Sequence, residues 1–252
     1  MNTNPIQGQG TSPQAWKASR RLAAVADIDG AELVPVGSRA VIISPHPDDE
    51  ILGCGGLLQL LAREHRQVLL ISVTDGSASH PTSSYWTPER LSIARPLESA
   101  DALKRLGLPL NQMQWVHGGF PDTGVASRES ELVAFLSTYL QPSDVVFTTW
   151  REDGHSDHEA VGRASLAAAQ ARGARVHEIP VWAWHWASPE DPRIPWDRAR
   201  KLPLDKWAQA RKRHAIQAFA SQLYSDPDTG HEPVLSAVTV ERLQQPFEVV
   251  FL

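Results

Sequence analysis

Residues 40–50 join a short apolar run to a turn crowded with polar side chains, because Ala40-Val41-Ile42-Ile43-Ser44 leads directly into Pro45-His46-Pro47-Asp48-Asp49-Glu50. A continuous, β-branched apolar run is typical of a strand that is buried on both faces, as in a parallel sheet. The two prolines restrict the backbone of the turn, which gathers one imidazole and three carboxylates. We therefore expect a parallel sheet with chemistry beyond the carboxyl end of its first strand.

The same alternation of apolar runs and amphipathic stretches continues along the chain. Strands are predicted at residues 68–73, 114–116, 144–149 and 176–186, an edge strand at 248–251, and helices at 55–65, 89–106, 129–140, 158–172 and 206–223. This order predicts a three-layer, Rossmann-like α/β domain with a mostly parallel sheet and helices on both faces. We assign residues 39–252 to this domain and residues 1–38 to an N-terminal tail, in which residues 15–25 favour a short helical arm.

The composition excludes several classes of protein. Hydrophobic residues make up 42% of the 252 residues, which is too many for a disordered chain, and a net charge of −5 argues against binding to nucleic acid or anionic lipid. Cys54 has no second cysteine to pair with, so a reducing cytoplasm is expected. Neither an export signal nor an apolar run long enough to span a membrane is visible. A homo-oligomer is one option, since the sequence does not fix the oligomeric state.

A second polar cluster, Gly154-His155-Ser156-Asp157-His158, also follows a predicted strand and opens a predicted helix. Taken alone, this cluster is also typical of a solvated loop. The first cluster, taken alone, is also typical of a polar cap at the start of a helix. Both clusters should nevertheless lie at the same rim of the sheet. Together they offer two nitrogens and one carboxylate, with a position left open for water, as expected of catalytic zinc; the three donors are His46, Asp49 and His158.

With these two motifs, the chain resembles the LmbE-like, or PIG-L, family of zinc-dependent de-N-acetylases, which act on N-acetylglucosamine conjugates. The motifs that carry the resemblance are Pro45 to Glu50 and His155 to His158. Further matches, in the family's order, are Thr74-Asp75-Gly76, Arg95-Pro96-Leu97-Glu98 and Gly119-Phe120-Pro121-Asp122. The resemblance spans about residues 41–222.

The resemblance implies a role for each matching residue. The metal ligands would be His46, Asp49 and His158, with zinc as the cofactor and another divalent ion such as Fe²⁺ as the alternative. Asp48 would be the general base, and His155 an imidazolium that stabilises the oxyanion while Asp157 orients it.

Two further residues would border the substrate pocket. Arg95 would contact sugar hydroxyls or a phosphate, with Glu98 positioning it, although an i,i+3 pair of charges is also common on a helix surface. Asp122 would bind a sugar hydroxyl, or else serves only the turn in which it lies.

Two other features bear on specificity. Relatives often carry a histidine two residues before a Ser-Gln pair, whereas this chain has Phe219-Ala220-Ser221-Gln222, so the outer pocket should differ. Trp182, Trp184 and Trp186 alternate along the predicted strand at 176–186, where they either form a stacking wall for substrate or pack in the interior; packing is the favoured interpretation.

The function that we expect is that of a cytoplasmic, zinc-dependent hydrolase. It would remove the acetyl group from an N-acetylglucosamine-type amino-sugar conjugate, releasing acetate and a free amine. The alternatives are an amidase for another N-acyl small molecule and a non-catalytic, metal-containing binding subunit. The expected partner is therefore a small molecule.

Overall fold

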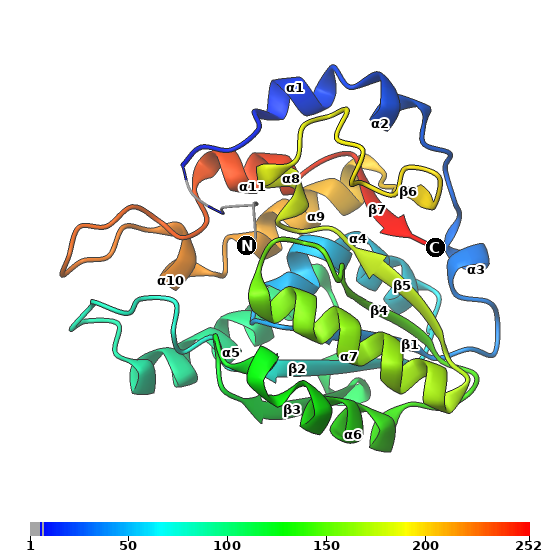
Figure 1. The fold of residues 1–252 in the computed structure, drawn as a ribbon, viewed down its shortest axis with the longest axis horizontal. Coiled ribbons are helices and arrows are strands. Elements are labelled where there is room, and N and C mark those ends of the chain that lie inside the picture. Colours follow the sequence, from blue (N-terminus) through cyan, green and yellow to red (C-terminus); the bar gives the residue numbers. More distant parts are fainter. Residues whose placement is uncertain (1–5, 7) are drawn as a thin grey trace.

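The computed structural model describes residue 6 and residues 8–252, and its centre is a seven-stranded sheet with helices on both faces (Figure 1). The strand order is β3-β2-β1-β4-β5-β7-β6. The strands are β1 Ala40–Ser44, β2 Val68–Thr74, β3 Gln114–Phe120, β4 Val145–Thr149, β5 Arg175–Ile179, β6 Ala199–Pro203 and β7 Phe247–Phe251. Strands β1 to β5 pair in parallel, whereas β7 pairs antiparallel with β5 and β6. The predicted mostly parallel α/β fold is confirmed.

The longer helices are α4 Asp49–Arg63, α5 Pro88–Leu106, α6 Glu129–Tyr139, α7 Ser156–Arg172 and α9 Lys206–Ile216. Shorter helices are α1 Pro13–Lys17, α2 Arg20–Ala24, α3 Gly30–Leu33, α8 Ala183–Trp186, α10 Ala220–Leu223 and α11 Ala237–Leu243. Two 3₁₀ turns, at Leu110–Gln112 and Val125–Arg128, complete the helical segments of the described chain.

The strands bury both of their faces, as the apolar run at residues 40–44 predicts. Val41 and Ile43 of β1 pack with residues of α6 and α7, such as Leu136. Ala40 and Ile42 point the other way and pack with α4, α5 and α9. Because successive side chains of a strand alternate between faces, one β-branched run supplies the core of both outer layers.

Helix α4 begins six residues earlier than predicted, at Asp49 rather than at residue 55. Glycines at positions 53, 55 and 56 lower helix propensity and concealed this start. The structure shows that glycine is needed here for close packing. A Cβ on Gly56 would lie 2.2 Å from a Leu204 methyl group, and one on Gly53 would lie 2.8 Å from Ile179. Close packing of α4 against its neighbours therefore outweighs local propensity, and it places Asp49 on the first turn of the helix.

Three other predictions of elements are corrected by the structure. The strand predicted at residues 176–186 ends at Ile179, because Pro180 follows, and its tryptophans lie instead in a turn and in α8. Strand β7 is not an edge strand, since β6 pairs outside it in a segment for which the sequence analysis predicts no strand. The helix predicted at 206–223 breaks into α9 and α10, with the buried Phe219 between them.

The N-terminal segment contains α1, α2 and α3, and it lies along one edge of the molecule (Figure 1). The division between residues 38 and 39 stays a prediction. In the described part of the chain, every helix is too short or too polar to cross a membrane.

Candidate metal centre and active site

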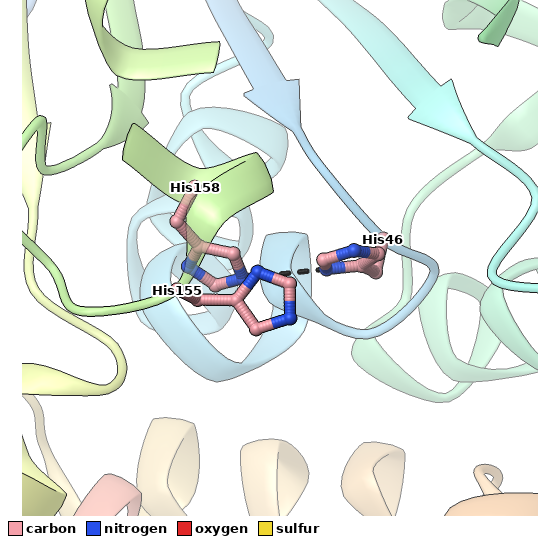
Figure 2. Close-up of side chains that lie close together, drawn as sticks. All are labelled: His46, His155 and His158. Carbon is pink, nitrogen blue, oxygen red and sulfur yellow. Dashed lines mark hydrogen bonds between the residues drawn. The ribbon is translucent and has the colours of Figure 1, made fainter. Parts of the chain in front are cut away.

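The two polar clusters lie side by side at the carboxyl ends of neighbouring strands. Strand β1 pairs in parallel with β4, so the turn that follows β1 and the loop that follows β4 leave the sheet at the same rim. Figure 2 shows the result, in which His46 approaches His158 and His155 from the opposite loop. Residues separated by more than 100 positions thereby share one site.

Three ligand-type atoms form a nearly equilateral triangle. His46 Nδ1 lies 3.3 Å from Asp49 Oδ2 and 3.3 Å from His158 Nε2, and the third side, from His158 Nε2 to Asp49 Oδ2, is 3.2 Å. Ligand atoms about 2.0–2.1 Å from a tetrahedral zinc ion lie about 3.3–3.4 Å from one another. The triangle therefore has the size that one zinc ion requires, and these atoms belong to the three residues predicted as ligands.

The far side of each imidazole faces a carboxylate. His158 Nδ1 lies 2.9 Å from Asp153 Oδ2, while His46 Nε2 lies 3.2 Å from Asp122 Oδ1 and 3.3 Å from Asp157 Oδ2. Carboxylates in this position hold the ring of a metal-binding histidine and make its ligating nitrogen more basic. The surroundings of both imidazoles thus fit metal ligation.

The electrostatic surroundings also favour a cation. Burial alone would lower the pKa of His158, but Asp49 and Asp153 outweigh burial and raise it to about 9. Burial alone would raise the pKa of Asp49, but His158 and His46 hold it well below its usual range. Because metal binding displaces protons from such groups, a divalent cation can take the place of the protons that this cluster attracts. The donor set and its field therefore fit zinc.

Asp48 lies beside this triangle in a strained backbone conformation. Its φ of +148° is one that side chains other than glycine rarely adopt, and strain of this kind concentrates at functional sites. Its Oδ2 accepts a hydrogen bond of 3.0 Å from Arg95. Burial raises the pKa of Asp48 to about 7, against the opposing effect of Arg95. Asp48 also lines the central cavity of the molecule.

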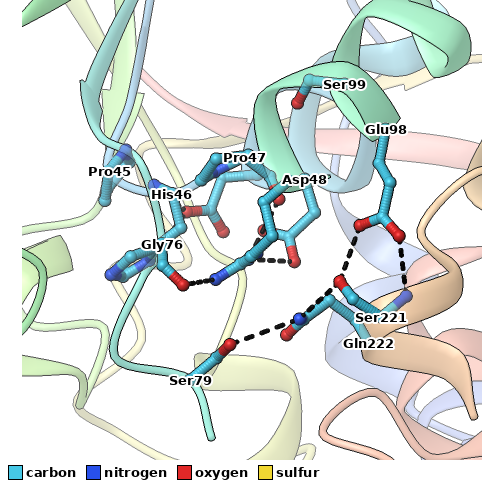
Figure 3. Close-up of polar contacts among 12 residues, drawn as sticks. Pro45, His46, Pro47, Asp48, Gly76, Ser79, Glu98, Ser99, Ser221 and Gln222 are labelled. Carbon is cyan, nitrogen blue, oxygen red and sulfur yellow. Dashed lines mark hydrogen bonds and ion pairs between the residues drawn. The ribbon is translucent and has the colours of Figure 1, made fainter. Parts of the chain in front are cut away.

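Arg95 is buried and holds the turn that carries Asp48. Figure 3 shows Asp48 within the polar network around this turn. Besides Asp48, Arg95 donates to the carbonyl oxygens of Gly76, at 2.9 Å, and Pro47, at 3.0 Å. The alternative interpretation, in which Arg95 and Glu98 form a charge pair on a helix surface, is wrong, because Arg95 is only 3% exposed. Glu98 does not hold Arg95 in place through a hydrogen bond; it accepts from the backbone N–H of Ser221, at 2.7 Å, and from its hydroxyl, at 2.6 Å.

His155 and Asp157 differ from their expected arrangement. The carboxylate of Asp157 contacts His46 and accepts from the backbone N–H groups of Thr123, at 2.7 Å, and Val125, at 3.2 Å. It reaches His155 only through its backbone N–H, which donates to Nδ1 at 3.2 Å. Burial, with help from neighbouring histidines, lowers the pKa of His155 to about 3, which favours the neutral ring over an imidazolium.

A cavity of about 400 Å³ opens onto the candidate site, and six of the eight predicted site residues line it. These six are His46, Asp48, Asp49, Arg95, Asp122 and His155, whereas Asp157 and His158 are not among the lining residues. Both carboxylate oxygens of Asp122 have protein partners, because Oδ2 also accepts from the backbone N–H of Ala78 at 2.8 Å. Trp182 and Trp184 line the cavity as well, whereas Trp186 stacks on Trp150.

Two residues of the site were missed in the sequence analysis. Asp153 is fully buried and also faces His158. It accepts from three consecutive backbone N–H groups that lead into α8, those of Val181, Trp182 and Ala183. The only feature of the local sequence that could have indicated a role for Asp153 is its position directly before the second polar cluster. Gln222 is fully buried and lines the cavity, and its Oε1 has no hydrogen-bond partner. The sequence analysis names Gln222 only as part of the Ser-Gln pair and predicts no role for it.

Comparisons with known proteins match this chain to deacetylases. The family model described as GlcNAc-PI de-N-acetylase, PIG-L, matches residues 41–169. An uncharacterized deacetylase of Escherichia coli K12, YaiS, is 33% identical over 152 residues, which cover 57% of this chain and 75% of that protein. A 1D-myo-inositol 2-acetamido-2-deoxy-alpha-D-glucopyranoside deacetylase of Streptomyces scabiei is 27% identical over 163 residues, 56% of this chain but only half of that protein.

A solved structure shows a similar fold. The crystal structure of the A40926 pseudoaglycone deacetylase Dbv21 matches with a TM-score of 0.56 and 26% identity, over 74% of this chain and 83% of that one. The family match covers half of the chain and includes both polar clusters. The chain therefore belongs to the PIG-L, or LmbE-like, family.

Proposed function

We propose that this chain is a zinc-dependent N-deacetylase that removes the acetyl group from an N-acetylglucosamine-type amino-sugar conjugate. The observation that carries this proposal is the triangle of His46 Nδ1, Asp49 Oδ2 and His158 Nε2, with the strained Asp48 beside it on the same cavity. The names of the matched relatives support the reaction and the class of substrate.

The metal would be held by His46, Asp49 and His158. When bound there, a zinc ion supplies a Lewis acid for the acetamide carbonyl and lowers the pKa of water. Fe²⁺ is the alternative ion, because imidazole and carboxylate ligands suit both metals.

Asp48 would act as the general base. Its carboxylate lines the cavity, and Arg95 fixes one of its oxygens, which leaves the other to accept a proton from the attacking water. The same carboxyl group can return that proton to the amine nitrogen as the amide bond breaks. One residue would thus serve both proton transfers.

His155 would stabilise the acetamide oxygen as negative charge develops on it. Because Nδ1 accepts the N–H of Asp157, the ring proton of the neutral imidazole lies on Nε2, where it is available as a hydrogen-bond donor. A neutral donor in a buried site stabilises an oxyanion without carrying a charge itself. This replaces the imidazolium expected from the sequence.

The sugar would lie against Arg95, Asp122 and Gln222. Gln222 Oε1 is a buried acceptor without a partner, and a sugar hydroxyl is the donor that would satisfy it. Arg95 and Asp122 would shape this part of the cavity, since their polar atoms are mostly engaged within the protein.

The test is acetate release from N-acetylglucosamine, its glycosides and N-acetyl amino acids, measured on protein whose metal content is known. The proposal expects about one zinc per chain and hydrolysis of N-acetyl sugars only. Hydrolysis of N-acetyl amino acids alone would support an amidase of another kind. A stoichiometric metal without any turnover would support a binding subunit. A cytoplasmic location would be checked by fractionation of the cells that make the protein.

A further inference from the structure

The N-terminal arm, defined as residue 6 and residues 8–19, lies outside the segment that matches the family model, residues 41–169. It contains α1, which lies next to α8 and close to α11 in Figure 1. These two helices carry part of the wall of the cavity, including Trp184, His185 and Arg242. The arm is therefore well placed to shape the site.

The arm is fastened to α8 by both backbone and side chain. Thr11 donates its backbone N–H to the carbonyl oxygen of His185 at 2.8 Å. The indole N–H of Trp16 donates to the carbonyl oxygen of Trp184 at 2.8 Å, and the two indole rings meet edge to face at 4.8 Å. Trp16 is only 2% exposed, so this contact is an interior one.

The arm is fastened to α11 through a buried guanidinium group. Arg242 is 1% exposed, and it donates to the backbone carbonyl oxygens of Gln9 and Thr11, the latter at 2.6 Å, and lies 3.1 Å from His185 Nδ1. A buried charged donor is costly to leave without acceptors, so the arm's carbonyl oxygens stabilise Arg242 and Arg242 holds the arm.

Apolar side chains also line the cavity, and those of Ile6, Leu52, Val181, Trp184, Leu235 and Leu243 are called its apolar section below. Ile6 comes from the arm itself. Two of the candidate metal ligands, His46 and Asp49, also line the cavity, and the acetamide would be bound beside them. The rest of a substrate would extend along the apolar section, where burial of apolar surface favours an apolar group.

We propose that the N-terminal arm completes the apolar section of the substrate cavity and that Ile6 limits the size of the apolar group carried there by an amino-sugar conjugate. This inference rests on the proposed function for the reaction, but its structural basis is the docking of the arm on α8 and α11. It narrows the substrate class to conjugates with a compact apolar substituent.

Two glycines of the arm provide a matched pair of variants. Gly8 and Gly10 both have positive φ, +72° and +60°, so a larger residue carries similar backbone strain at either position. A Cβ on Gly10 would lie 2.6 Å from the carbonyl oxygen of His185 and 2.7 Å from its ring, whereas a Cβ on Gly8 would meet nothing within 4 Å. Gly10→Val should therefore displace the arm, and Gly8→Val should leave it docked.

The experiment compares kcat/KM for the methyl, phenyl and naphthyl N-acetyl-β-D-glucosaminides. For Gly10→Val and Ile6→Ala, we expect the naphthyl to phenyl ratio to rise by about 10-fold or more, as when a hydrophobic pocket gains space. The unaltered chain and Gly8→Val should keep the same ratio. Ile6→Ala removes only side-chain atoms, so it decides the question if Gly10→Val fails to fold. An unchanged ratio in the folded variants overturns the proposal.

Affinity for a compound that needs no hydrolysis separates this inference from the proposed function. Phenyl and naphthyl 1-thio-β-D-glucosides lack an acetamide, and their dissociation constants can be measured by calorimetry. If none of the N-acetyl sugars is hydrolysed, the proposed deacetylase is wrong. The role of the arm still stands if Gly10→Val and Ile6→Ala bind the naphthyl compound relatively tighter than Gly8→Val, and it falls if all the variants show the same preference or do not bind.

Discussion

Replacing Asp48 by Asn tests the division of labour between two adjacent carboxylates. The amide keeps the shape of Asp48, and its oxygen can still accept the 3.0 Å hydrogen bond from Arg95, so the turn should persist. The change removes only the basic carboxylate, so turnover should fall by about 10²–10⁴-fold, the range for loss of a general base. Metal content should remain near that of the unaltered chain.

Asp49→Ala should show the opposite pattern. Asp49 Oδ2 supplies one corner of the triangle and faces both His46 and His158, at 3.3 and 3.2 Å, so its loss removes the only anionic member of the donor set. Metal and activity should disappear together, and added zinc should restore part of both. Asp101→Ala, at a half-exposed aspartate on α5, is the control for the loss of a carboxylate.

Metal analysis by mass spectrometry, paired with acetate-release kinetics on the same samples, provides the measurement. Loss of metal from Asp48→Asn together with its retention in Asp49→Ala would show that the two roles are reversed. Normal turnover in Asp48→Asn at full metal content would refute the general-base mechanism.

Three further predictions follow from buried polar groups. Asp153→Ala should weaken zinc binding by about 10–100-fold in a competition titration, because it removes the carboxylate behind His158; unchanged affinity would contradict that role. Lys212→Ala should lower the free energy of unfolding by about 3–5 kcal/mol in denaturant melts, because it leaves Glu248, 2.6 Å away, as a buried charge without its partner; a loss below about 1 kcal/mol would show that the pair is solvated. Burial lowers the pKa of His177 to about 4, so protonation of the unfolded chain should reduce stability by about 1–2 kcal/mol between pH 7 and pH 5, and His177→Gln should remove this loss; equal pH dependence of both melts would refute it.

The parallel part of the sheet was predictable because its strands are apolar on both faces. Residues 40–44, 68–73 and 144–149 have no polar alternation, and all three become central, parallel strands. Strand β6 escaped prediction because Ala-Arg-Lys-Leu-Pro carries a weak, edge-type pattern beside several prolines. Its position depends on β7, a pairing across more than 40 residues that no local signal reveals.

The proximity of His46, Asp49 and His158 could be predicted from the sequence because each motif follows a strand, and parallel strands bring such turns to one rim. The supporting contacts could not, since they depend on side-chain direction. Asp157 was expected to orient His155, but its carboxylate points instead to His46 and to the N–H groups of Thr123 and Val125. Adjacent residues at the start of a helix point in different directions, and spacing alone does not decide which partner each side chain meets.

Phe219 stands at the position where the sequence analysis expects a histidine in many relatives, and the structure shows that its side chain does not face the cavity. Phe219 is fully buried and packs in the core between α9 and α10, and it is absent from the residues that line the cavity. Gln222 is therefore the residue of this segment that presents a polar group to the cavity. Its amide nitrogen donates to Ser221 Oγ at 2.9 Å (Figure 3), and its Oε1 is a buried acceptor without a partner. An acceptor of this kind selects a ligand with a hydroxyl or N–H at that point, because a ligand without one leaves it unsatisfied. Gln222→Leu should consequently raise KM for N-acetyl sugars more than it lowers kcat, whereas a purely structural role would lower the melting temperature and leave KM unchanged.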